Sequence, residues 1–142
     1  MAPSDVKTVR NGVLKGYNST TVGKAFEGTF RDTKWTTFET PKGVTVVEFN
    51  GTINADVLWK ADFRPSGQGM DSAHETCHTS FGQFYATDPT WLACFIPLIQ
   101  KVPIPVNFQF FLSADKQTFK VGYMDSKPFA RDLDAVLAFV YR

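Results

Sequence analysis

The clearest pattern in the chain is an alternation of apolar and other residues near the C-terminus. Every second position from 106 to 112 is apolar (Val106, Phe108, Phe110 and Leu112). Because successive side chains of a strand point to opposite faces of a sheet, this alternation predicts a strand. Residues 113–116 have the composition of a turn, and residues 119–123 alternate again. The two runs together predict an antiparallel hairpin.

A helical pattern precedes a second pair of predicted strands near the N-terminus. Val22, Ala25, Phe26 and Phe30 recur at helical spacing, and the hydroxyl residues 19–21 can cap the first turn. Residues 34–40 and 44–50 predict two strands joined by a tight turn at residues 41–43. Upstream, residues 6–17 predict a short strand that is broken by the hairpin-type dipeptide at residues 11–12.

A helix is predicted to close the chain. Ser126 and Pro128 suit a helix start, and an apolar stripe follows them (Leu133, Val136, Leu137, Val140 and Tyr141). Each end of the chain thus combines a hairpin with a helix. We therefore predict one α+β domain over residues 1–142, with an antiparallel sheet of four to five strands and the N-terminal and C-terminal helices packed on one face.

Residues 54–105 separate the two hairpin-and-helix units, and we interpret them as an insert. Residues 55–63 predict a further strand, residues 64–69 a flexible loop, and residues 71–85 a helix capped by Asp71 or Ser72. Residues 91–99 form an apolar run that is too short to span a membrane. Pro97, Pro103 and Pro105 argue against a long helix or a central strand here.

Composition narrows the classes of function. The chain has 142 residues, of which 43% are hydrophobic, and a formal net charge of +1. A protein that binds nucleic acid through phosphates normally carries a basic surplus, so we expect no nucleic-acid partner. The first residues lack the basic and apolar regions of a signal peptide. A mature exported domain expressed behind an added start methionine would show the same pattern.

The two cysteines, Cys77 and Cys94, lie 17 residues apart in the insert. They form either one disulfide or two buried, reduced thiols. We favour the disulfide, because an irregular segment gains most from a covalent link.

The motif with the most specific chemistry is His-Glu-Thr-Cys-His at residues 74–78. It fits the H-E-x-x-H pattern, in which His74 and His78 share one helix face as zinc ligands and Glu75 is the general base. A third ligand is needed, but no glutamate follows Glu75, and Asp88 is close in sequence. We favour a solvated polar helix with no cofactor. The alternatives are a small zinc-dependent metallohydrolase and a non-catalytic metal site that includes Cys77.

Aromatic residues of the insert are the candidate binding residues. Residues 59–64 mix aromatic and charged side chains, as protein interfaces do. We therefore predict that Trp59, Phe63 and Arg64 contact a partner. An edge strand whose charges discourage aggregation is the competing interpretation. A second group of aromatic residues either fills the core beneath the insert or forms an exposed patch that contacts a partner. From this group we predict Trp91 and Phe95 as binding residues. The group consists of Phe81, Phe84, Tyr85, Trp91 and Phe95.

Several segments of the first fifty residues, and more loosely the last forty, resemble a small domain of bacterial envelope proteins and lipoproteins. The resemblance rests on residues 9–12, Tyr17, residues 21–26, residues 34–35, Phe38, Gly43 and residues 47–51. It implies an exported, periplasmic or envelope-associated location and a non-enzymatic role. We therefore expect a binding or accessory module that meets a protein partner through the insert and does not span the membrane. The alternative is the zinc-dependent hydrolase.

Overall fold

The computed structural model describes residues 4–81 and 89–142 of the chain. These residues contain an antiparallel sheet of four strands in the order β1-β2-β3-β4. The long β2–β3 pairing joins two hairpins, and it runs from Val46 opposite Phe111 to Asn54 opposite Pro103. The strand count lies within the predicted range, and both predicted hairpins are confirmed. The strands are Arg31–Glu39 (β1), Thr45–Asn54 (β2), Pro103–Leu112 (β3) and Phe119–Met124 (β4).

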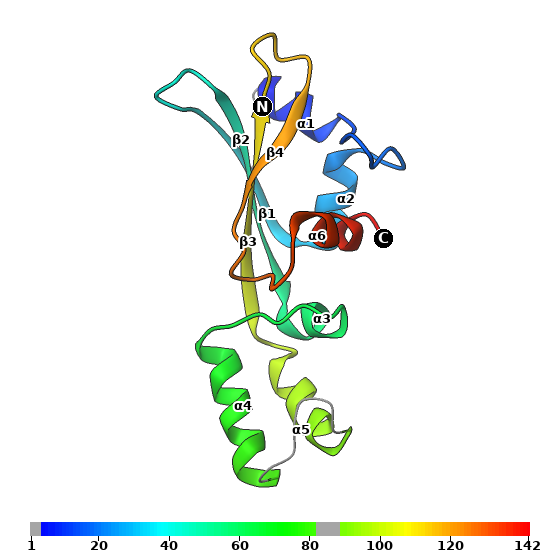
Figure 1. The fold of residues 1–142 in the computed structure, drawn as a ribbon, viewed down its shortest axis with the longest axis vertical. Helices are drawn as coiled ribbons and strands as arrows, with labels where there is room; N and C mark the ends of the chain where they lie inside the picture. Colours follow the sequence, from blue (N-terminus) through cyan, green and yellow to red (C-terminus); the bar gives the residue numbers. More distant parts are fainter. Residues whose placement is uncertain (1–3, 82–88) are drawn as a thin grey trace.

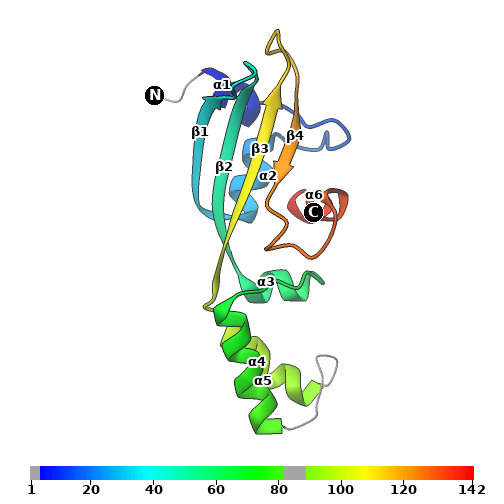
Figure 2. The ribbon, with the colours of Figure 1, turned by 60° about the vertical axis from the view of Figure 1, so that its left-hand side comes forward.

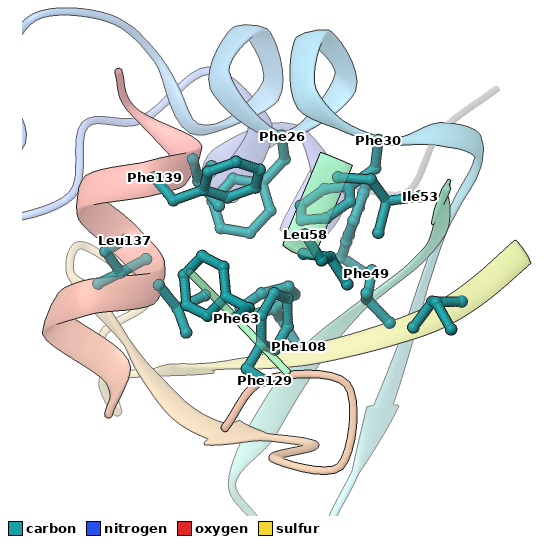
Figure 3. Packing of buried hydrophobic residues seen from close by; sticks show 14 of the residues in the cluster. Phe26, Phe30, Phe49, Ile53, Leu58, Phe63, Phe108, Phe129, Leu137 and Phe139 are labelled. Carbon is teal, nitrogen blue, oxygen red and sulfur yellow. The ribbon is translucent and has the colours of Figure 1, made fainter. Parts of the chain in front are cut away.

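Helices from both ends of the chain cover one face of this sheet (Figure 1). They are Ser4–Arg10 (α1), Val22–Thr29 (α2) and Leu133–Val140 (α6). Phe26 of α2 lies at the centre of the core, with its ring centroid 5.3 Å from that of Phe49 and 5.0 Å from that of Phe108 (Figure 3). The predicted α+β class, with N-terminal and C-terminal helices on one sheet face, is therefore confirmed.

Side-chain caps fix the starts of α2 and α6. The hydroxyl of Thr21 accepts a hydrogen bond from the amide of Lys24 at 3.3 Å, as the hydroxyl-rich segment before α2 predicts. The carboxylate of Asp132 accepts from the amide of Ala135 at 2.9 Å. The last helix therefore begins at Leu133, and the predicted start near Ser126 and Pro128 is too early.

Two segments predicted as strands are helices. Residues 4–10 form α1, in which Val6 and Val9 are both buried, and Ala55–Lys60 forms a short helix, α3. The carboxylate of Asp56 lies 3.6 Å from the ammonium of Lys60, one turn further along α3. Both predictions failed because a short apolar segment fits helical and strand spacing almost equally well.

The insert adds two more helices, Gln68–Phe81 (α4) and Pro89–Ile99 (α5), to α3. α4 and α5 lie side by side and project beyond the end of the sheet (Figures 1 and 2). α4 begins three residues before the predicted cap at Asp71, and residues 82–85 of the predicted helix lie outside the described residues. α5 contains Pro97 and ends two residues later at Ile99, so the apolar run forms a helix of 11 residues and not a central strand.

β3 contains Pro103 and Pro105 although it is a central strand. The pairing with β4 starts only at Phe108, so β3 is an edge strand where the two prolines lie. Proline is tolerated at an edge, because no neighbouring strand requires its missing N–H group. The two prolines therefore lie where β3 has only one neighbouring strand, and the apolar run before them, residues 91–99, forms no strand.

Candidate functional site

A cluster of aromatic rings lies inside the insert. The rings of Trp91 and Phe95 stack with centroids 4.4 Å apart, and the ring of Trp59 lies 4.6 Å from that of Phe95. Trp91 and Phe95 are completely buried. These two residues therefore fill a core, and the interpretation of them as an exposed patch is wrong. Phe84 and Tyr85 of the same predicted patch lie outside the described residues.

Arg64 packs on the exposed side of Trp59. Its guanidinium carbon lies 4.2 Å from the centroid of the Trp59 ring, and the same group donates to the carbonyl of Phe63 at 2.8 Å. A cation held over an aromatic ring at a solvent-accessible site contributes about 0.5–1 kcal/mol. Trp59 is half-buried and Arg64 is exposed, so both have atoms within reach of a partner.

Phe63 anchors the insert to the rest of the domain. Its ring makes edge contacts with Phe129 and with Phe139 of α6, both at 5.4 Å between centroids (Figure 3). It is 2% exposed. Of the five predicted binding residues, Phe63, Trp91 and Phe95 are thus buried, and only Trp59 and Arg64 can touch another molecule in this conformation.

The H-E-x-x-H motif lies on α4 as predicted, with His74, Glu75 and His78 exposed. The imidazole of His74 packs against Trp91, with centroids 4.9 Å apart. Cys77 is bonded to Cys94, so its sulfur is not available as a thiolate ligand. In the described part of the chain, no group of three or more His, Cys, Asp or Glu side chains is arranged to hold a metal ion. Asp88 lies outside that part.

The Cys77–Cys94 disulfide links α4 to α5, which confirms the predicted pairing. Cys77 is completely buried and lies one turn after His74. The disulfide and the aromatic cluster therefore hold the two projecting helices together at neighbouring points.

The outer side of α5 is the feature that the aromatic candidates missed. No polar or charged side chain occurs from Trp91 to Ile99, yet burial is limited to Trp91, Phe95 and Ile99. Ala93 and Pro97 are exposed, Leu98 is 45% exposed, and Leu92 and Ile96 are half-buried. We call these five residues the α5 outer surface. The signal for it in the sequence is the apolar run at residues 91–99, in which residue type alone singles out Trp91 and Phe95.

The side chains of Glu48, Asn50, Asn107 and Gln109 alternate along β2 and β3 with the buried residues Phe49 and Phe108, so they form a polar network on the sheet face opposite α1, α2 and α6. The Glu48 carboxylate accepts from the Gln109 amide at 3.0 Å and from the Asn50 amide at 3.3 Å, and Asn107 donates to Asn50 at 2.8 Å. Burial raises the pKa of the Glu48 carboxyl, but hydrogen bonds from Asn107, Gln109 and Asn50 outweigh it and leave the pKa below its ordinary value. A carboxylate held ionised is a poor proton donor, so this network does not suit acid catalysis.

A hollow of about 300 Å³ lies where α4 and β3 begin, beside the segment that leads to α6. Its floor is formed by apolar residues such as Met70 and Ile104, and its rim carries Ser66, Asp125 and Lys127. Ser66 has no histidine beside it in this lining, so the hollow offers no activated nucleophile.

Comparison of the chain with protein-family models, with curated proteins and with solved structures gives no match. The fold class therefore rests on the structure itself, which is a two-layer α+β domain with a disulfide-linked helical insert. None of the described helices is long and apolar enough to cross a membrane.

Proposed function

We propose that this protein is a non-enzymatic binding module that holds a partner protein against the α5 outer surface. One observation carries the proposal: from Trp91 to Ile99, α5 has no polar or charged side chain, yet only Trp91, Phe95 and Ile99 of this stretch are buried. A helix that is hydrophobic all round normally lies inside a protein or a membrane. Exposed, contiguous apolar residues on a folded domain are typical of interaction sites.

The way the insert is built supports this proposal. The stacked Trp91 and Phe95 rings and the Cys77–Cys94 disulfide fix α5 on its inner side. A surface that is already rigid loses little conformational entropy when it binds. Trp59 and Arg64 add an aromatic ring and a cation on the same insert, and both residue types are enriched at interfaces.

The proposed location is the bacterial envelope, as a periplasmic protein or lipoprotein. The disulfide supports an oxidising compartment, because thiols of cytosolic proteins are kept reduced. The resemblance of the first fifty residues to envelope domains points the same way. The proposal is that an exported scaffold carries the insert toward a protein in that compartment.

Site-specific photo-crosslinking tests the proposal. A photoreactive amino acid replaces Leu98 on the α5 outer surface or, as the control, Ser72, an exposed residue of α4. In the cells that make the protein, we expect one defined protein adduct from position 98 and none from position 72. Ala93→Asp should abolish the adduct, because a buried, unpaired charge in an apolar interface is costly.

The fold of each variant is checked by circular dichroism, so that a lost adduct cannot reflect unfolding. An adduct that survives Ala93→Asp, or equal adducts from both positions, would contradict the proposal. No adduct from position 98 would also contradict it.

A further inference from the structure

His74 and His78 are the two histidines of the chain, and both lie on α4 of the projecting insert (Figure 2). They are four residues apart, and both are exposed. Side chains at positions i and i+4 of a helix lie on the same face, with about 5–6 Å between their Cβ atoms. Two imidazoles at this separation can hold one ion between them, because a metal–nitrogen bond is about 2 Å long.

The surroundings of the pair restrict its geometry. The ring of His74 packs against the rings of Trp91 and Phe95, at 4.9 Å and 5.8 Å between centroids. Cys77, the residue before His78, is completely buried and is bonded to Cys94 of α5. The backbone of α4 is therefore anchored between the two histidines, and little conformational entropy is lost when they bind an ion together.

Two carboxylates share this face of α4. Asp71 precedes His74 by three residues and Glu75 precedes His78 by three, so each lies beside an imidazole on the helix surface. Neither acidic residue enters an ion pair within residues 4–81 and 89–142. α4 contains no lysine or arginine. The face thus combines two nitrogen ligands with two negative charges, which attract a cation.

We infer that His74 and His78 form a binding site for a divalent copper ion. Imidazole is a ligand for both copper and zinc, and Cu²⁺ forms the more stable complex with a given set of ligands. Zinc sites normally use three or four protein ligands, and no third His, Cys, Asp or Glu is arranged with this pair in the described part of the chain. Cu²⁺ accepts a square-planar set of nitrogen and oxygen atoms, so two imidazoles and two water molecules satisfy it.

The inference assigns no catalytic role to Glu75. A hydrolase of the H-E-x-x-H type holds its zinc ion with a third protein ligand, which the described residues do not supply. A thiolate from Cys77 would favour zinc or Cu⁺, but its sulfur is bonded to Cys94. The pair therefore binds an ion and links two successive turns of α4.

Copper binding to the full chain tests the inference. Isothermal titration calorimetry with Cu²⁺, with glycine present to compete for weak sites, should give one ion per chain. His74→Asn and His78→Asn should each weaken binding by roughly a hundredfold, because each loses the second, intramolecular bond of the chelate. Trp91 lies against His74, so bound Cu²⁺, which is paramagnetic, should also quench tryptophan fluorescence.

The matched control exchanges two residues of α4. The double variant Thr76→His, His78→Thr keeps the composition of the chain but places the two histidines two residues apart, where they do not share a helix face. It should bind Cu²⁺ as weakly as the single variants, and circular dichroism checks that every variant is folded.

Three results would overturn the inference. They are a wild type that binds no Cu²⁺ in the presence of glycine, an exchanged variant that binds as tightly as the wild type, and a wild type that binds Zn²⁺ more tightly than Cu²⁺. None of these results involves the α5 outer surface, so the binding proposal is tested separately.

Discussion

The indole ring of Trp91 lies stacked on the phenyl ring of Phe95 at 4.4 Å, inside a pair of helices that projects from the sheet. Both residues belong to α5, one turn apart, and neither is exposed. The insert therefore has an aromatic core of its own, which Trp59 extends from α3. This core explains how a short helical projection keeps its shape beyond the end of the sheet.

Trp91→Ala should destabilise the protein by about 3–5 kcal/mol, because it removes a large buried ring and leaves a cavity. Urea unfolding followed by circular dichroism measures the loss. Leu98→Ala, on the exposed side of the same helix, is the control and should cost less than about 1 kcal/mol. Equal costs for the two variants would show that the stacked rings do not hold the insert.

Reduction of the Cys77–Cys94 disulfide should lower stability by about 3 kcal/mol, because it frees a loop of 17 residues in the unfolded chain. Thermal unfolding with and without dithiothreitol measures this effect. The chain has 2 cysteines, so the reductant has no other target. The double variant Cys77→Ala, Cys94→Ala should melt at the same temperature with and without reductant, and a reductant effect on that variant would count against the interpretation.

The scaffold could be predicted because its patterns are long. The alternation from Val106 to Leu112 and the spacing of Val22, Phe26 and Phe30 each cover several repeats, so only one periodicity fits. α3 could not be predicted in this way. β2 passes into it at Asn54 without a turn, and Ala55–Lys60 is too short to show a period.

The effect of a proline depends on which side of an element faces solvent. Pro97 lies inside α5, where it removes the hydrogen bond to the carbonyl of Ala93. Both residues are on the exposed side, so water can reach that carbonyl and the helix continues. The site prediction failed for the same reason: residue type selected Trp91 and Phe95, but only the fold shows that they face inward.

Gly122→Ala should cost about 1–3 kcal/mol. A Cβ at this position in β4 would overlap the ring of Phe111, which lies over the glycine on the adjacent strand. Gly28→Ala in α2 is the control, since its new Cβ meets nothing, and it should stabilise by about 0.4–1 kcal/mol. In a Phe111→Ala background the Gly122→Ala penalty should vanish. Chemical denaturation of the wild type, the two single variants Gly122→Ala and Phe111→Ala, and the double variant tests this. A penalty that persists there would mean that the ring is not the obstacle.

The pH dependence of unfolding should change when Glu48 is replaced by glutamine. Hydrogen bonds hold the folded-state pKa of Glu48 below its ordinary value of 4.5, even though burial opposes them. Glu48 therefore contributes stability that is present above pH 4.5 and is lost as the pH falls through the lowered folded-state pKa. The free-energy difference between wild type and Glu48→Gln, measured by urea unfolding across acidic pH, should shrink as the pH falls. Gln109→Ala, which removes one donor at 3.0 Å, should weaken the same pH dependence in part. If both variants lose stability with acid as steeply as the wild type, the network on the open sheet face is not what keeps this carboxylate ionised.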